Sequence, residues 1–207
     1  MTILHIDSSP LGAASVSRLL TERLVRKLQS ADPGVAVVHR DLAAAPPDHL
    51  GAEALPVVKF GKTEDLTPRQ QAERALTDQL VEEFLAADTV VIGAPMYNFS
   101  IPSQLKAWID RVAQPGRTFR YSESGPVGLA GGRTVYLVST RGGRYAGTPF
   151  ETALDHQEAY LRAVLGFFGV TEIVVIRAEG VALGAEARAE AIAAAEAEMS
   201  GLPPAPG

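Results

Sequence analysis

The feature that most constrains the fold is the alternation of short apolar runs with segments of helical periodicity. Five runs rich in β-branched residues lie at 2–6, 35–39, 90–94, 134–139 and 173–176. Such runs are typical of strands buried on both faces, and the segments between them carry apolar residues at helical spacing. This order predicts an α/β protein with a doubly wound, five-stranded parallel sheet and helices on both faces.

The connections give further boundaries. Thr67, Pro68 and Gln70 predict a helix start, with a capping threonine, a proline at the first helical position and a glutamine that completes a capping box. Residues 41–66 and 117–132 read as surface insertions, not as domain boundaries. We therefore expect one domain over residues 1–200, followed by a flexible tail at 201–207.

Composition excludes several classes of function. The 207 residues suffice for one α/β domain, and their net charge of −5 argues against a nucleic-acid partner or an anionic membrane surface. No cysteine is present, which excludes disulfides, thiolate metal sites and the cysteine nucleophile of a low-molecular-weight phosphatase. We read neither a secretory signal nor a membrane-spanning run, so a cytoplasmic protein is expected.

Three loops follow the first, third and fourth predicted strands, whose carboxyl ends meet at one edge of a doubly wound sheet. The first loop leads into a helix and carries Ser9, Ser15, Val16 and Ser17. Hydroxyl groups and the free N–H groups of a helix N-terminus suit a phosphate dianion. Taken alone, the loop is more typical of a serine-capped helix, and a phosphate site is favoured only when the other two loops are considered with it.

The second loop begins abruptly after an apolar strand. It consists of Pro95, Met96, Tyr97, Asn98 and Phe99, a mixture of aromatic, amide and thioether groups that suits a planar heteroaromatic ring. The alternative is that the apolar members fill the core and the asparagine forms a turn.

The third loop contains Thr140, Arg141, Gly142 and Gly143, and its glycines allow the backbone to approach a ligand closely. An ordinary glycine turn is the alternative. The four histidines of the chain show no metal-ligand spacing, so no metal site is predicted. We read Asp155 and His156 as a solvated pair on a helix.

Four segments together carry a family resemblance: Leu-Thr-Pro-Arg-Gln-Gln at 66–71, Ala-Pro-Met-Tyr-Asn-Phe at 94–99, Thr-Phe-Arg-Tyr at 118–121 and Ser-Thr-Arg-Gly-Gly at 139–143. They resemble the FMN-dependent NADH:quinone oxidoreductases, also called azoreductases, and the resemblance covers nearly the whole chain. It implies a flavodoxin-like fold, a homodimer and one non-covalently bound FMN per subunit.

The resemblance also implies roles for the three loops. Ser9 and residues 15–17 would hold the FMN phosphate, residues 95–99 would line the isoalloxazine ring, and residues 140–143 would lie at its pyrimidine edge. Relatives often carry a polar side chain where this chain has Val16, so a backbone N–H contact is expected there. Further candidates for the substrate pocket are Phe119, Tyr121 and Phe167, for which aromatic core or dimer contacts are the alternative.

The implied reaction is a ping-pong transfer of two electrons, in which NADH or NADPH reduces the flavin and a quinone or azo compound then reoxidises it. The cofactor performs this chemistry, so no side-chain acid or base is assigned. The competing class is a flavodoxin-type electron carrier, which shares the fold and FMN but turns over no small molecule. The two insertions favour an enclosed substrate pocket, and therefore the enzyme.

Overall fold

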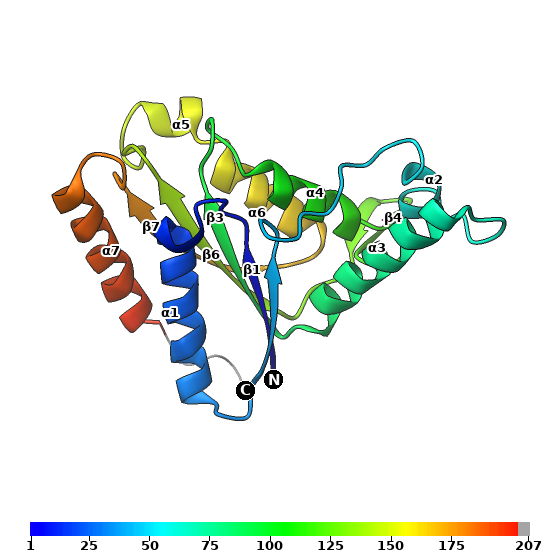
Figure 1. Ribbon diagram of the computed structural model, residues 1–207, viewed down its shortest axis with the longest axis horizontal. Coiled ribbons are helices and arrows are strands. Elements are labelled where there is room, and N and C mark those ends of the chain that lie inside the picture. Colours follow the sequence, from blue (N-terminus) through cyan, green and yellow to red (C-terminus); the bar gives the residue numbers. More distant parts are fainter. Residues whose placement is uncertain (203–207) are drawn as a thin grey trace.

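The main sheet is all parallel, as predicted. A computed structural model describes residues 1–202 and orders the strands β2-β1-β3-β6-β7 (Figure 1). Their bounds are β1 (Thr2–Asp7), β2 (Ala36–Asp41), β3 (Thr89–Pro95), β6 (Thr134–Arg141) and β7 (Glu172–Glu179). All four pairings between neighbouring strands are parallel, which confirms the doubly wound α/β architecture.

Helices cover both faces of this sheet (Figure 1). The helices are α1 (Val16–Ala31), α2 (Leu55–Val58), α3 (Pro68–Ala86), α4 (Ser103–Val112), α5 (Phe150–Leu154), α6 (Gln157–Phe167) and α7 (Ala185–Ser200), with a 3-10 turn η1 (Gly12–Ala14). Helices α1 and α7 pack on one face, while α3, α4 and α6 pack on the other. Alternate strand residues therefore enter different cores: Ile3 lies on the α1 face and Leu4 on the opposite face.

The predicted capping box is present at the start of α3. The Thr67 hydroxyl accepts a hydrogen bond from the Gln70 backbone N–H at 3.2 Å, and the Gln70 side-chain oxygen accepts one from the Thr67 N–H at 3.1 Å. Pro68 occupies the first helical position. The start of α3 is therefore set by hydrogen bonds between residues that are close together in the sequence.

Other boundaries differ from the predictions. The strand expected to end at 139 continues through Thr140 and Arg141, because both residues pair with β7. Helix α2 interrupts the predicted irregular segment 41–66, and the short helix α5 was not predicted. Leu202, expected to begin a free tail, packs partly buried against the core beneath α1 and α7. The remaining tail residues, 203–207, lie outside the described residues.

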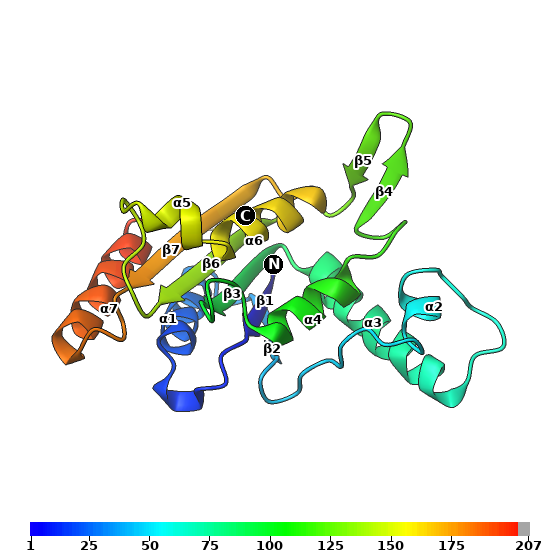
Figure 2. The same cartoon turned by 90° about the horizontal axis from the view of Figure 1, so that it is seen from above.

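The insertion at 117–132 forms an antiparallel hairpin of β4 (Phe119–Ser122) and β5 (Gly125–Gly128). The hairpin extends away from the main sheet (Figure 2). Its base is fixed to the end of α6, where the Ala130 N–H donates to the Phe168 carbonyl at 2.7 Å. Within residues 1–202, no helix is both long and apolar enough to cross a bilayer.

Gly128 allows that close approach, because a Cβ at this position would lie 2.2 Å from the Gly169 backbone nitrogen. We expect Gly128→Ala to lower the free energy of unfolding by roughly 1–3 kcal/mol, the usual cost of overpacking. Urea denaturation followed by circular dichroism measures the change. Gly51→Ala is the control, since no atom lies within 4 Å of its added Cβ. Equal stability of the two variants would contradict the close contact.

Candidate functional site

Strand register brings the three predicted loops to one edge of the sheet. Asp7 at the end of β1 pairs with Gly93, and Pro95 at the end of β3 pairs with Thr140. Beyond the strands, the Met96 N–H donates to the Thr140 carbonyl at 2.8 Å. The loops therefore leave three adjacent strands side by side, as expected for the ligand-binding edge of an open α/β sheet.

The serine loop places its hydroxyl groups at the N-terminus of α1. Ser9, Ser15 and Ser17 are all buried, and the Ser15 and Ser17 oxygens lie 3.0 Å apart. Ser15 caps the helix by accepting a hydrogen bond from the Arg18 N–H. The Val16 side chain packs into the apolar core, so this residue offers a ligand only its backbone N–H. Unpaired N–H groups, hydroxyls and the helix dipole together favour an anion here.

Arg18 holds this loop in place. Its Nε donates to the Ser9 carbonyl at 3.0 Å, and its two terminal nitrogens donate to the Asp41 carboxylate at 2.7 and 2.5 Å. Asp41 also accepts hydrogen bonds from the Ala43 and Ala44 N–H groups. The hydrogen bond from Arg18 lowers the pKa of Asp41 to about 2, against the opposing effect of burial. An ion pair to β2 thus fixes the position of the serine loop.

The second loop contains a strained two-residue turn. Tyr97 and Ser100 exchange backbone hydrogen bonds of 2.9 and 3.1 Å, while Asn98 and Phe99 have φ values of 49° and 70°. Two positive φ angles in succession are typical of a type I′ turn, in which a residue such as Phe99 costs about 1–2 kcal/mol. The His156 N–H donates to the Phe99 carbonyl at 3.1 Å and supports this conformation. Strain of this kind clusters at functional sites.

A cavity of about 740 Å³ opens beside this turn. Pro10 reaches it from the serine loop, Tyr97 and Asn98 from the turn, Lys106 from α4 and Tyr160 from α6. The volume lies within the range of small-molecule pockets, and most of the lining surface is apolar. The Tyr97 hydroxyl lies 3.4 Å from the hydroxyl of Ser9, which joins the serine loop to this wall.

The third loop offers backbone groups only. Gly142 and Gly143 accept hydrogen bonds through their carbonyls from Ala182 and Gly180, whereas their N–H groups have no partner among residues 1–202. Because the strand ends later than predicted, Thr140 and Arg141 belong to β6 and precede this loop. The free N–H groups are the part of the loop suited to a ligand.

The side chain of Arg141 is engaged within the protein. Its guanidinium is fully buried and donates to three carboxylates, those of Asp155, Glu158 and Glu179, at 2.6, 2.5 and 2.8 Å. Only its backbone remains for a ligand. Asp155 is likewise no solvated helix residue, because it binds Arg141 and accepts hydrogen bonds from the first N–H groups of α6.

Gln157 is a structural part of the site that the sequence did not reveal. Its side chain is fully buried, donates to the Ala94 carbonyl at 2.6 Å and accepts from the Ser139 hydroxyl at 2.9 Å. It therefore joins the ends of β3 and β6 beneath the strained turn. A glutamine at the start of a helix carries no local signal of such a contact.

The predicted substrate-pocket aromatics lie elsewhere in the single chain. Phe119 packs on Phe167 with ring centroids 4.4 Å apart and on Tyr121 at 5.5 Å. Phe167 ends α6, whose 11 residues extend about 16 Å from the turn-side end of that helix. None of the three lines the 740 Å³ cavity, and the Tyr121 side chain is 73% exposed on the hairpin.

The ion pair of Arg18 with Asp41 predicts an acid-dependent stability. A folded pKa of about 2, below the unfolded value near 3.9, stabilises the protein above pH 4, and this contribution disappears as the pH falls through 2. Because Asp41 is partly exposed, we expect the ion pair to contribute about 1 kcal/mol to the free energy of unfolding. Urea denaturation at pH 7 and at pH 3 should show Asp41→Asn less stable than wild type at pH 7, with a smaller difference at pH 3.

Asp65→Asn is the control, since this aspartate is exposed on a loop. A stability difference between Asp41→Asn and wild type that does not shrink at low pH would contradict the assigned ion pair.

Comparison with known proteins identifies the family. A family model described as having a flavodoxin-like fold matches residues 1–202. The FMN-dependent NADH:quinone oxidoreductase of Azospirillum brasilense is 65% identical over 98% of this chain and 97% of its own length. That of Polaromonas naphthalenivorans is 55% identical, with 95% and 91% covered.

Solved structures agree with this result. The azoreductase of Bacillus anthracis strain Sterne superposes with a TM-score of 0.88 at 31% identity, with 97% of each chain covered. An FMN-dependent NADH-azoreductase of the Ames Ancestor strain, solved in complex with FMN, gives a TM-score of 0.85 at 25% identity, with 96% of this chain and 97% of that chain covered. The chain therefore belongs to the family of FMN-dependent NADH:quinone oxidoreductases, which adopt the flavodoxin-like fold.

Proposed function

We propose that this protein is a single-domain, FMN-dependent oxidoreductase that passes two electrons from NADH or NADPH to quinones and reductively cleaves azo compounds. The observation that carries the proposal is the meeting of three loops at one sheet edge: buried serines at a helix N-terminus, a strained aromatic turn and a pair of free glycine N–H groups. The names of the 65% and 55% identical relatives and of the superposed azoreductases support it.

The serine loop fits the phosphate of FMN. We assign the phosphate to the hydroxyls of Ser9, Ser15 and Ser17 and to the backbone N–H of Val16. The positive end of the α1 dipole would balance part of the phosphate charge. Arg18 acts indirectly, because its guanidinium is engaged by Asp41 and the Ser9 carbonyl and so holds the loop in shape.

The other two loops fit the flavin ring. We assign one ring edge to the five residues of the second loop, which are Pro95, Met96, Tyr97, Asn98 and Phe99. The pyrimidine edge is assigned to Thr140, to the backbone of Arg141 and to the N–H groups of Gly142 and Gly143. Such N–H groups stabilise negative charge that develops on a bound ring. Bound FMN, one per chain and held without a covalent bond, supplies the group that accepts a hydride and returns two electrons.

The 740 Å³ cavity is the proposed place for the substrate, beside the ring that the three loops would hold. Its apolar lining, with Tyr97 and Tyr160 on its walls, suits flat aromatic molecules such as quinones and azo dyes. A pocket of this size beside the three loops favours an enzyme over an electron carrier, which needs only an exposed cofactor edge. No side-chain acid or base is required for the transfer.

A homodimer accounts for the aromatic residues that lie away from this cavity. Phe119, Tyr121 and Phe167 gather around a hairpin that extends from the body of the chain (Figure 2). We propose that this hairpin packs against a second copy and brings Tyr121 toward the partner subunit's pocket. An exposed aromatic side chain on an extended hairpin favours such a contact. A cytoplasmic location completes the proposal.

The purified protein is expected to be yellow and to release free flavin on denaturation. It should oxidise NADH or NADPH in the presence of quinones and decolourise an azo dye under the same conditions. A steady-state assay with several quinones, one azo dye and both nicotinamides measures this activity. Colourless protein that takes up no added FMN would refute the proposal, and flavin binding without turnover would identify a carrier.

Ser17→Glu tests the phosphate assignment. The added carboxylate would lie beside the FMN phosphate, and at the effective dielectric of a protein site two such charges repel by a few kcal/mol, so we expect at least a tenfold weaker affinity for FMN. The recovery of flavin fluorescence on dilution measures the dissociation constant. Ser30→Glu, at an exposed position in the last turn of the same helix, should leave the affinity unchanged. Equal affinities of the two variants would place the phosphate elsewhere.

A further inference from the structure

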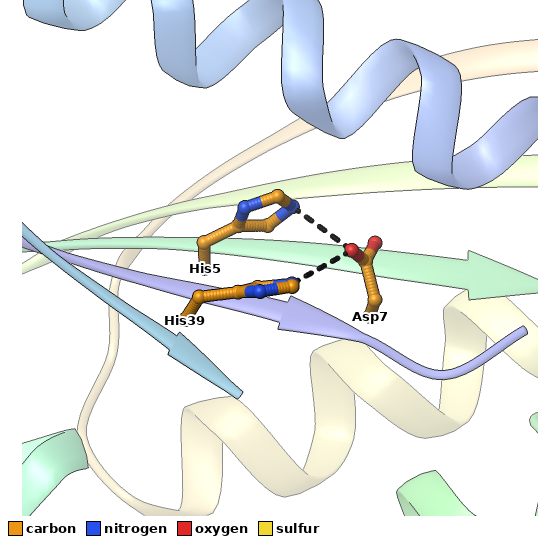
Figure 3. A group of neighbouring side chains, drawn as sticks. All are labelled: His5, Asp7 and His39. Carbon is orange, nitrogen blue, oxygen red and sulfur yellow. Dashed lines mark hydrogen bonds and ion pairs between the residues drawn. The ribbon is translucent and has the colours of Figure 1, made fainter. Parts of the chain in front are cut away.

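Two neighbouring strands present histidines to the same side of the sheet. His5 and Asp7 are two residues apart on β1, so both side chains face α1, whereas Leu4 and Ile6 face the opposite side of the sheet. His39 on β2 is the register partner of His5, and the two rings lie 4.5 Å apart (Figure 3). This pairing gathers two imidazoles and one carboxylate, although 32 positions separate Asp7 from His39 in the sequence.

The donor atoms have the separations of a metal site. His39 Nε2 lies 3.0 Å from Asp7 Oδ2, His5 Nε2 lies 3.4 Å from the same oxygen, and all three lie within 4.8 Å of one another (Figure 3). Zinc binds histidine nitrogen and carboxylate oxygen at about 2.0–2.2 Å, which sets neighbouring ligand atoms about 3.4 Å apart in a tetrahedral site. The separation of His5 from Asp7 therefore matches a tetrahedral site, and that of His39 from Asp7 would lengthen by about 0.4 Å.

His5 supplies a second indication of a ligand. Its Nε2 is buried and makes no well-formed hydrogen bond within residues 1–202: its nearest polar partner is Asp7 Oδ2 at 3.4 Å, and its side chain is only 10% exposed. A buried nitrogen without a good hydrogen bond is costly, at up to about 1–3 kcal/mol. Coordination of a metal ion through this nitrogen would remove that cost.

The carboxylate is already oriented for coordination. The Thr21 hydroxyl donates to Asp7 Oδ1 at 2.9 Å, and both residues are buried, so Oδ2 is left facing the two histidines. Hydrogen bonds of this kind orient metal ligands in known sites. The Asp7 carboxylate therefore has the orientation needed for coordination without a bound ion.

The group is open to solvent on one side. His5, Asp7 and His39 line a cavity of about 590 Å³ that also reaches Glu22 on α1. The opening provides an entry path and room for water ligands. The Arg18 guanidinium also lies near Asp7, with 3.7 Å between Nη1 and Oδ2, but the Asp41 carboxylate already balances its charge.

We propose that His5, Asp7 and His39 form a binding site for a divalent transition-metal ion that prefers nitrogen ligands, with Zn²⁺ as the probe. Two imidazoles and one carboxylate supply three ligands and leave the remaining positions to water. The site lies on the α1 face of β1, and none of its three ligands is assigned to FMN, although Ser15 also lines the cavity in front of it. Its test therefore does not depend on the proposed function.

Titration calorimetry of the tag-free full chain, as purified, with ZnCl₂ tests the proposal. We expect one Zn²⁺ per chain, and at least tenfold weaker binding in both His39→Gln and His5→Gln. The His39 side chain is 49% exposed, so its replacement leaves the core intact and keeps the test valid if His5→Gln fails to fold. His49→Gln is the matched control, because that histidine is exposed and lies outside the cluster.

Two results would overturn the proposal: no saturable one-to-one binding by the wild type, or equal affinities of His39→Gln and His49→Gln. Anomalous diffraction at the zinc edge from a soaked crystal provides an independent measurement. The ion is expected within about 2.0–2.2 Å of the three donor atoms. An ion bound elsewhere on the chain would refute the assignment.

Discussion

The parallel register of β1, β3 and β6 is the constraint on which the rest of the structure depends. It places three chain segments, distant in sequence, at a single sheet edge, and every element of the candidate site is attached there. Two apolar cores, one on each face, hold this register, because a shift by one residue would exchange the residues buried against α1 with those buried against α3 and α6. The geometry of the site therefore follows from the pairing of the strands beneath it.

Charged and polar contacts, and not apolar packing, then set the shape of the loops. Arg18 joins the serine loop to β2 through Asp41, and Arg141 gathers three carboxylates under the third loop. Gln157 joins the ends of β3 and β6. Removing one partner of a buried charged pair leaves the other uncompensated, so such networks hold a loop in one conformation even where their net contribution to stability is small. The strained turn at Asn98 and Phe99 directly follows the end of β3 that Gln157 holds.

Strand β1 presents side chains to both faces of the sheet. Leu4 and Ile6 enter one core, whereas His5 and Asp7 face α1 with His39 of β2. The same alternation that makes β1 a central strand therefore places the proposed metal site on the face opposite to Leu4 and Ile6. The loop that follows Asp7 carries the serines assigned to FMN, so one strand positions both sites without sharing a ligand between them.

The strands, most helices, the Thr67 capping box and the three loops were predictable from the sequence, because each depends on residues close together in the chain. Which side chains are available to a ligand depends on tertiary contacts. Arg141 turned out to be buried in ion pairs, Phe119 and Tyr121 lie on a hairpin away from the cavity, and His5 meets His39 across a strand pair. Periodicity reports local conformation, whereas contacts between distant strands and helices follow from register and packing, which leave no fixed spacing in the sequence.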